Sequence, residues 1–263
     1  MQKMPKEWKV LAIGNSFSAD TLEHLANIAL AMGAEKVKVA NLYIGGCSIR
    51  KHYRLATENL AEYEYHVNNG EGWSMTLGHG IADEVKSENW DWISIQHGTG
   101  DGSYYTREEY YENLPALVKF VKDNAWSGAK IAFNMTWVGE MDFDHHEIRS
   151  FEGDQLEMYR QIAALTGSVV AGVEGIEKIS PTGTAVQNAR SLTSQLLTRD
   201  GYHLSWDTGR YIAGLTFFKT LTGLDISNIS WAPEGTDEQA KAIAIASVDA
   251  ALETPYAVTQ FER

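Results

Sequence analysis

One serine and a late aspartate–histidine pair are the residues of this sequence best suited to chemistry. Ser16 follows an apolar run and opens a helical pattern, where converging backbone N–H groups favour a developing negative charge. Asp200 and His203 are spaced so that the carboxylate can orient the imidazole, which can then take a proton from a serine hydroxyl. Each feature alone also has a plainer interpretation, because Ser16 can simply cap a helix and Asp200 can cap a loop with a surface histidine.

Strand-length apolar runs alternate with helical periods, which predicts a parallel sheet covered by helices on both faces. We expect five strands, at Trp8–Ile13, Val37–Tyr43, Trp90–Gln96, Ala129–Met135 and Gly175–Ile179. We expect helices from the turn after Ser16 to Met32 and at Ser48–His66, Arg107–Asn124, Asp154–Thr166, Thr184–Leu197, Asp207–Leu221 and Thr236–Leu252, with loops at Asn68–Gly80 and Gly139–Gly153. Ligands of such sheets bind beyond the carboxyl ends of the strands, where Ser16 lies.

The segments around these residues resemble the sequence blocks of the SGNH (GDSL-like) hydrolases, a superfamily of serine esterases. Gly14 to Ser18 is similar to the first block, with Asn15 where aspartate is commoner, and Asp200 to Ser205 is similar to the last. The chain looks closest to a bacterial branch described mainly as of unknown function. The resemblance implies one flavodoxin-like domain over residues 1–263, a three-layer αβα sandwich with a five-stranded parallel sheet. It also implies Ser16 as nucleophile, His203 as general base and then acid, and Asp200 as its orienting group.

The oxyanion hole is where the sequence departs from that family. The resemblance implies the Ser16 N–H and a glycine N–H as donors, and we assign the glycine to Gly46, with Gly45 close behind. The family's third donor, an asparagine, has no counterpart after the third strand. Gln96 carries the same amide on a longer stem, and such a donor typically contributes about 2.7–4 kcal/mol. Alternatively, Gln96 braces a loop and His97 or a backbone group is the donor.

The expected substrate is a short acyl ester, acetyl above all, carried by a small molecule or a carbohydrate. Candidate substrate-binding residues are Asn15, Gly45, His97 and Trp137, and Trp73 is a second aromatic that could face a sugar ring. Hydrolysis through an acyl-enzyme on Ser16 requires no cofactor and no metal. Two alternatives stay open: a flavodoxin-like protein that binds phosphate or a nucleotide, and a catalytically inactive SGNH fold that binds sugars.

Composition excludes several other classes of protein. The 263 residues carry 22 Lys+Arg and 35 Asp+Glu, a formal net charge of −13 without a basic cluster, which argues against nucleic acid as a partner. Cys47 is the single cysteine, so thiolate metal clusters are excluded, and Asp142, Asp144, His145 and His146 are expected to form a solvated loop. No run of about 20 apolar residues spans a membrane. The sequence as written indicates a cytoplasmic protein; removal of a signal peptide would make it periplasmic or secreted. The oligomeric state is left open.

Overall fold

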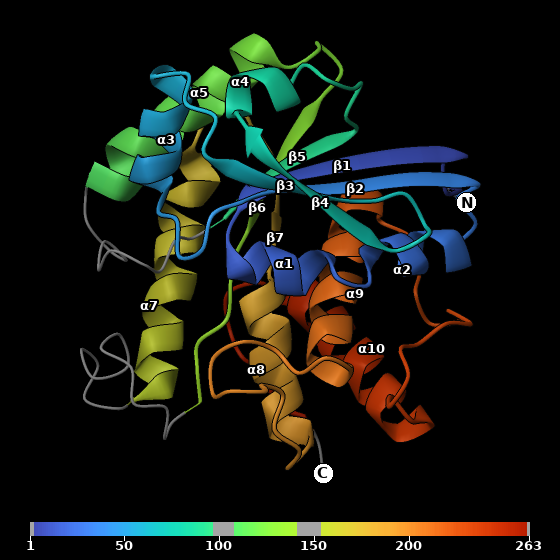
Figure 1. Cartoon of the computed structure of the whole chain (residues 1–263). Helices are drawn as coiled ribbons and strands as arrows, with labels where there is room; N and C mark the ends of the chain where they lie inside the picture. Colours follow the sequence, from blue (N-terminus) through green and yellow to red (C-terminus); the bar gives the residue numbers. More distant parts are fainter. Residues whose placement is uncertain (1–2, 97–107, 141–153, 262–263) are drawn as a thin grey trace.

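Seven strands form one mixed sheet in the computed structural model, which describes residues 3–96, 108–140 and 154–261 (Figure 1). The strands are β1 (Glu7–Gly14), β2 (Lys36–Tyr43), β3 (Tyr63–Asn68), β4 (Trp73–His79), β5 (Trp92–Gln96), β6 (Lys130–Asn134) and β7 (Ile176–Ser180). Their order is β4-β3-β2-β1-β5-β6-β7. The five neighbouring strands β2, β1, β5, β6 and β7 run parallel to one another, in the order typical of flavodoxin-like sheets. β3 pairs antiparallel with β2, and β4 pairs antiparallel with β3.

Helices cover both faces of the sheet (Figure 1). They are α1 (Ser16–Leu22), α2 (Leu25–Ala31), α3 (Ile49–Thr57), α4 (Ile81–Glu84), α5 (Leu114–Asn124), α7 (Gln155–Ser168), α8 (Thr182–Leu192), α9 (Thr208–Thr222) and α10 (Glu238–Glu253), with short helical turns at Glu108–Asn113 and Val170–Gly172. Val10 and Ala12 of β1 pack toward α1, α2, α8, α9 and α10, whereas Leu11 and Ile13 pack toward α3, α4 and α5. Burial on both faces explains why β1 reads as a continuous apolar run. Within the described ranges, no helix is long and apolar enough to cross a membrane.

The five expected parallel strands are present, but the sheet has seven strands, which corrects the predicted count of five. The error lies in the segment from 48 to 80. The helix expected at Ser48–His66 ends at Thr57, and Asn59 follows it with a left-handed φ of 52° that breaks the helical path. β3 then begins at Tyr63, and the expected loop Asn68–Gly80 contains β4. The β4 strand alternates apolar and hydroxyl residues only from Trp73 to Leu77, and the glycines at positions 70, 72, 78 and 80 make the segment resemble a loop.

The first expected helix is in fact two short helices. α1 begins at Ser16 itself and ends at Leu22, and α2 begins at Leu25. Between them His24 leaves the helical conformation, and its Nε2 forms a hydrogen bond of 2.8 Å with the carbonyl oxygen of Trp206. The break therefore joins the first helical segment to the loop before α9.

Behind the loop that follows β2, a buried histidine joins α3 to β3. The Oη of Tyr63 lies 2.7 Å from Nδ1 of His52, and Sγ of Cys47 lies 3.5 Å from the same nitrogen. Burial, aided by the charge of Lys51, lowers the pKa of His52 to about 3. The ring is therefore neutral, and its Nδ1 shares one hydrogen bond with the phenol of Tyr63.

This buried histidine should make stability depend on pH. Its pKa of about 3 in the folded protein lies below the ordinary value, so its contribution to the free energy of unfolding is complete above about pH 6.5 and is lost as the pH falls toward 3. The loss approaches about 1.4 kcal/mol per pH unit. We expect the stability difference between the wild type and His52→Gln to shrink as the pH falls from 7 to 4, measured by urea unfolding. A constant difference would contradict a neutral buried His52.

Candidate active site

Ser16, His203 and Asp200 lie together at the carboxyl edge of the parallel strands. Ser16 is the first residue of α1, directly after β1, and the other two lie in the loop between α8 and α9. His203 Nε2 is 3.0 Å from Ser16 Oγ, and His203 Nδ1 is 2.7 Å from Oδ2 of Asp200. Because the carboxylate accepts from Nδ1–H, Nε2 is left to accept the serine hydrogen. The side chains of His203 and Asp200 remain 28% and 47% exposed, so a substrate can approach them.

The Asp200 carboxylate is held in place by its own loop. Its Oδ1 accepts hydrogen bonds from the backbone N–H groups of Tyr202, at 3.0 Å, and His203, at 2.7 Å. Burial, the largest single influence, raises the pKa of Asp200, but the hydrogen bonds from the His203 ring and the two N–H groups together lower it below its ordinary value. An ionised Asp200 can therefore fix the tautomer of the imidazole and stabilise the imidazolium.

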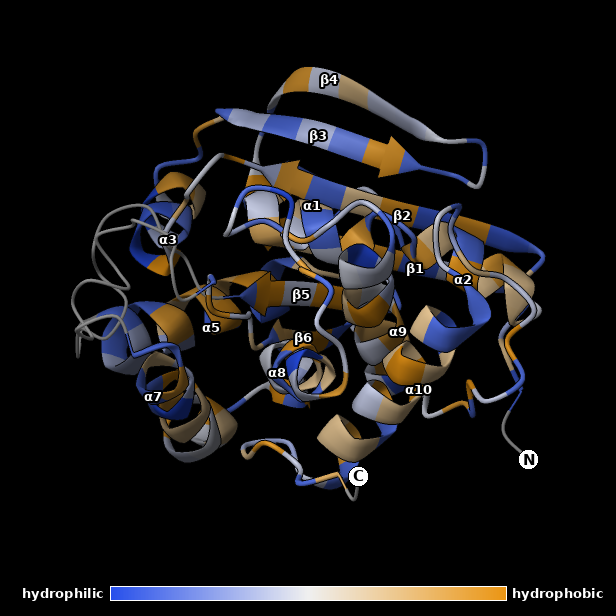
Figure 2. Cartoon of the chain, turned by 90° about the horizontal axis from the view of Figure 1, so that it is seen from below, coloured by the Kyte–Doolittle hydropathy of each residue, from blue (hydrophilic) through white to orange (hydrophobic). Residues whose placement is uncertain are grey.

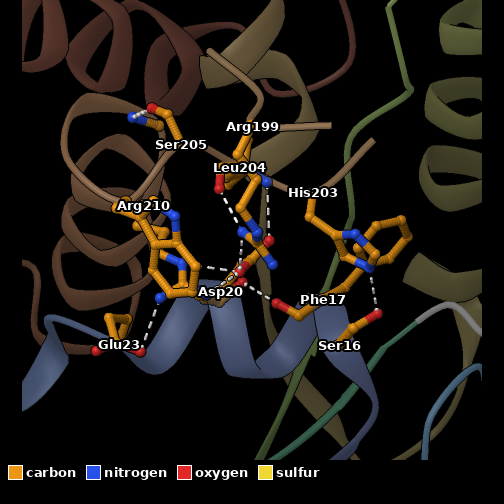
Figure 3. A network of polar contacts seen from close by, with 12 residues as sticks. Ser16, Phe17, Asp20, Glu23, Arg199, His203, Leu204, Ser205 and Arg210 are labelled. Atoms are coloured by element: carbon orange, nitrogen blue, oxygen red, sulfur yellow. Dashed lines mark hydrogen bonds and ion pairs between the residues drawn. The ribbon is translucent and has the colours of Figure 1, made fainter. Parts of the chain in front are cut away.

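A second carboxylate, Asp20, ties the helix of Ser16 to the loop of His203 (Figure 3). Asp20 is completely buried, one helical turn after Ser16. It accepts hydrogen bonds from the backbone N–H of Leu204 at 2.8 Å, from Arg199 Nη1 at 2.9 Å and from Arg210 Nε at 2.8 Å. Sequence reasoning missed this residue, because its partners lie about 180 positions away and no motif spacing marks them.

An exposed tryptophan covers this ion cluster. The guanidinium carbons of Arg199 and Arg210 lie 4.6 and 3.9 Å from the centre of the Trp206 ring. Arg210 also pairs with Glu23 at 3.0 Å, at the end of α1. Stacking on an aromatic face stabilises the two cations while their charges are directed at Asp20.

Asn15 joins three segments that meet at the site. Its Oδ1 accepts hydrogen bonds from the backbone N–H of Phe17 at 2.9 Å and from Gln96 Nε2 at 2.7 Å. Its Nδ2 donates to the carbonyl oxygen of Cys47 at 3.1 Å. An amide supplies both the acceptor and the donor, whereas an aspartate here would face the Cys47 carbonyl with a second acceptor. Asn15 and Gln96, the two positions at which the sequence differs from the SGNH pattern it resembles, are thus in direct contact.

The glycines considered for the oxyanion hole lie in the turn after β2. Gly46 has a φ of 60°, a conformation that favours glycine, and the N–H of Cys47 closes the turn onto the carbonyl of Ile44 at 3.2 Å. The Asn15 contact to Cys47 places this turn beside the first residues of α1.

The aromatic candidates are less exposed than a sugar platform requires. Trp137 is 1% exposed, donates its indole N–H to the Tyr202 carbonyl at 2.9 Å and lies against Phe17. It therefore packs against the loop that carries Asp200 and His203 instead of facing solvent. Trp73 is partly buried against the core under α2. His97, Asp142, Asp144, His145 and His146 lie outside the described residues. In the part of the chain that is described, no three His, Cys, Asp or Glu side chains are grouped to hold a metal.

Comparison with known proteins places the chain in a family, and several solved structures share its fold. A family model described as "Domain of unknown function (DUF4886)" matches residues 9–251. A crystal structure of a DUF4886 family protein from Bacteroides uniformis ATCC 8492 is 32% identical, with a TM-score of 0.90 over 97% of this chain and 98% of that one. No curated protein matches the sequence.

More distant structures share the fold. A putative platelet activating factor from Streptococcus pneumonia is 16% identical, with a TM-score of 0.54 over 82% of this chain and 84% of that one. Axe2, an acetylxylan esterase from Geobacillus stearothermophilus, is 17% identical, with a TM-score of 0.50 over 88% of this chain and 99% of that one.

Neutralising Asp20 should destabilise the protein strongly. Asp20→Asn preserves the shape of the side chain but removes the buried charge that Arg199 and Arg210 share, leaving Arg210 only the partly exposed Glu23; breaking a buried ion pair typically costs about 3–5 kcal/mol. The matched change Asp123→Asn removes an exposed carboxylate that pairs with Lys119, and it should alter the free energy of unfolding by less than about 1 kcal/mol. Urea unfolding of both variants measures the difference, and equal effects would contradict the role assigned to Asp20.

Proposed function

The chain belongs to the DUF4886 family, and from the triad that it carries we propose that it is a single-domain serine esterase of the SGNH type. The observation that carries the proposal is the continuous path from Ser16 Oγ to His203 Nε2, 3.0 Å, and from Nδ1 to Asp200, 2.7 Å. A protein that only binds phosphate or a nucleotide has no need of a general base at this position.

The reaction runs through an acyl-enzyme. Oγ of Ser16 attacks the carbonyl carbon of the ester while its proton passes to Nε2 of His203. The tetrahedral intermediate collapses, the bond to the alcohol breaks, and the imidazolium gives its proton to the departing oxygen. Water then attacks the acyl group with the same base, the acid leaves, and Ser16 regains its proton.

The oxyanion is stabilised by three donors in this proposal. They are the N–H of Ser16, the N–H of Gly46 and the side-chain amide of Gln96. One amide hydrogen of Gln96 is directed at Asn15, and the second is the one that we assign to the oxyanion. The hydrogen bond to Asn15 would hold the Gln96 amide in position before the oxyanion forms. The long glutamine side chain then loses less conformational freedom in the reaction than a glutamine without this hydrogen bond would.

We assign short acyl esters, acetyl above all, as the substrates, carried by a carbohydrate. The acetylxylan esterase with the same fold supports this class, since its site must also admit an acetyl group on a sugar. The partial exposure of the triad side chains supports an alcohol larger than the acyl group. Every step uses groups of the chain itself. Gly45 would line the acyl side of the site, whereas the completely buried Asn15 would hold Gln96 in place without touching the substrate.

Replacing the nucleophile tests the proposal directly. Ser16→Ala should lower the rate of p-nitrophenyl acetate hydrolysis by roughly 10⁴-fold or more and leave the fold intact by circular dichroism. Ser227→Ala, which removes an exposed hydroxyl bound to Asp225, should keep the wild-type rate. Turnover retained by Ser16→Ala would refute Ser16 as nucleophile. A wild type without turnover on aryl or sugar acetates would favour the binding alternatives, distinguished by a bound flavin or by sugar affinity.

The role of Gln96 can be separated from simple bracing by kinetics. Gln96→Met keeps the length of the side chain and removes both amide hydrogens, so kcat should fall roughly 10²-fold with KM little changed. Gln161→Met makes the same change on the exposed face of α7 and should leave kcat unaltered. A variant of lower melting temperature with kcat within about threefold of wild type would assign Gln96 to bracing Asn15 alone.

A further inference from the structure

The strand β4 forms one end of the sheet and has an open edge. Among the described residues it pairs only with β3, so the N–H and C=O groups of its outer side have no neighbouring strand. Figure 2 shows β4 as the outermost strand of the sheet. Open edges of this kind readily accept another strand, and natural proteins usually protect them with charges, proline or bulges.

Most of this edge lacks such protection. From Trp73 to Leu77 the strand carries no charged side chain and no proline. Met75 and Leu77 are 53% and 70% exposed, although both are large and apolar. A bulge at Gly78, with a φ of 81°, leaves that residue without a partner on β3 and limits the regular edge to these five positions. In a chain with a net charge of −13, an uncharged edge is also where two copies repel least.

The residues of β4 alternate between two kinds. Trp73, Met75 and Leu77 point to one face of the sheet, and Ser74 and Thr76 point to the other. The pairing with β3 agrees, since Met75 lies opposite His66 and Leu77 opposite Glu64, on the face that also carries Tyr43. The five residues therefore read apolar, hydroxyl, apolar, hydroxyl, apolar in both directions.

We propose that β4 pairs antiparallel with β4 of a second copy of this chain, across a two-fold axis at Met75. In this register Met75 faces Met75 of the second copy, Trp73 faces Leu77, and Ser74 faces Thr76. Every apolar side chain then meets an apolar one, and every hydroxyl meets a hydroxyl, pairs that stabilise antiparallel strands. A peptide of another protein could use the same backbone edge, but this pattern pairs like residues with like when the strand meets its own copy across a two-fold axis.

The first experiment measures mass against concentration. Because the contact is small, the wild type should change from monomer to dimer between about 1 μM and about 1 mM in sedimentation equilibrium. Met75→Lys places like charges opposite each other at the axis and should remain monomeric, with an unchanged circular dichroism spectrum. Leu196→Lys introduces a lysine at a 67% exposed leucine in the loop between α8 and α9, far from β4 in the sequence, and this variant should still dimerise. A wild type that stays monomeric throughout, or a dimer that survives Met75→Lys, would overturn the proposal; the former leaves the edge to another protein.

The second experiment tests the register. In the proposed pairing, the Cβ atoms at position 75 lie about 5 Å apart, close enough for a disulfide, so Met75→Cys should form a covalent dimer under mild oxidation. Position 77 lies opposite position 73, which separates the two Leu77 residues by about 14 Å, so Leu77→Cys should not cross-link. Cys47 is 2% exposed and does not compete. Cross-linking of Leu77→Cys in preference to Met75→Cys would refute this register.

Discussion

The buried carboxylate of Asp20 is the constraint on which the site depends. Ser16 and Asp20 lie one turn apart on α1, and Leu204, which donates to Asp20, directly follows His203. The separation of Ser16 and His203 is therefore set by a short rigid helix on one side and one residue of chain on the other. Desolvating a carboxylate is costly, and here two guanidinium groups and a backbone N–H offset that cost. A serine at a helix start and a histidine in a distant loop stay in register because this cluster does not tolerate a looser arrangement.

The contact between Asn15 and Gln96 gives one physical reason for the two positions at which the sequence differs from the SGNH pattern it resembles. Asn15 must donate to the Cys47 carbonyl and accept from Phe17 and Gln96, which an amide can do and a carboxylate cannot. With the amide in place, the residue at the end of β5 has to reach Oδ1, and the longer stem of glutamine does so at 2.7 Å. Asn15 and Gln96 are thus one hydrogen-bonded pair, and each side chain is positioned by the other.

The sequence predicted the parts of the fold that bury apolar groups on a regular period. The parallel strands β1, β2, β5 and β6 were predictable because most of their side chains are buried on both faces, whereas β7 is only partly buried and was marked by Ile176 and Ile179. Ser16, Asp200 and His203 were predictable because local spacing marks them. The β3–β4 hairpin was not predicted, since the left-handed residue after α3 is Asn59 rather than a glycine, and the glycine-rich segment around β4 resembles a loop. Asp20 was beyond prediction for another reason: its role arises from Arg199 and Arg210, which only the folded chain brings near.

The carboxyl edge of the parallel strands and the open edge of β4 impose different requirements on the chain. At the carboxyl edge, Asn15, Asp20 and Gln96 are buried and hydrogen-bonded, whereas His203 and Asp200 stay partly exposed. At the lateral edge of β4, the backbone itself is the exposed polar surface, and its side chains are small hydroxyls or apolar groups. When two β4 strands pair antiparallel, all strands of the second copy run opposite to their counterparts in the first. The two carboxyl edges would then face opposite ends of a continuous sheet, so association through β4 would leave Ser16, Asp200 and His203 of both copies accessible.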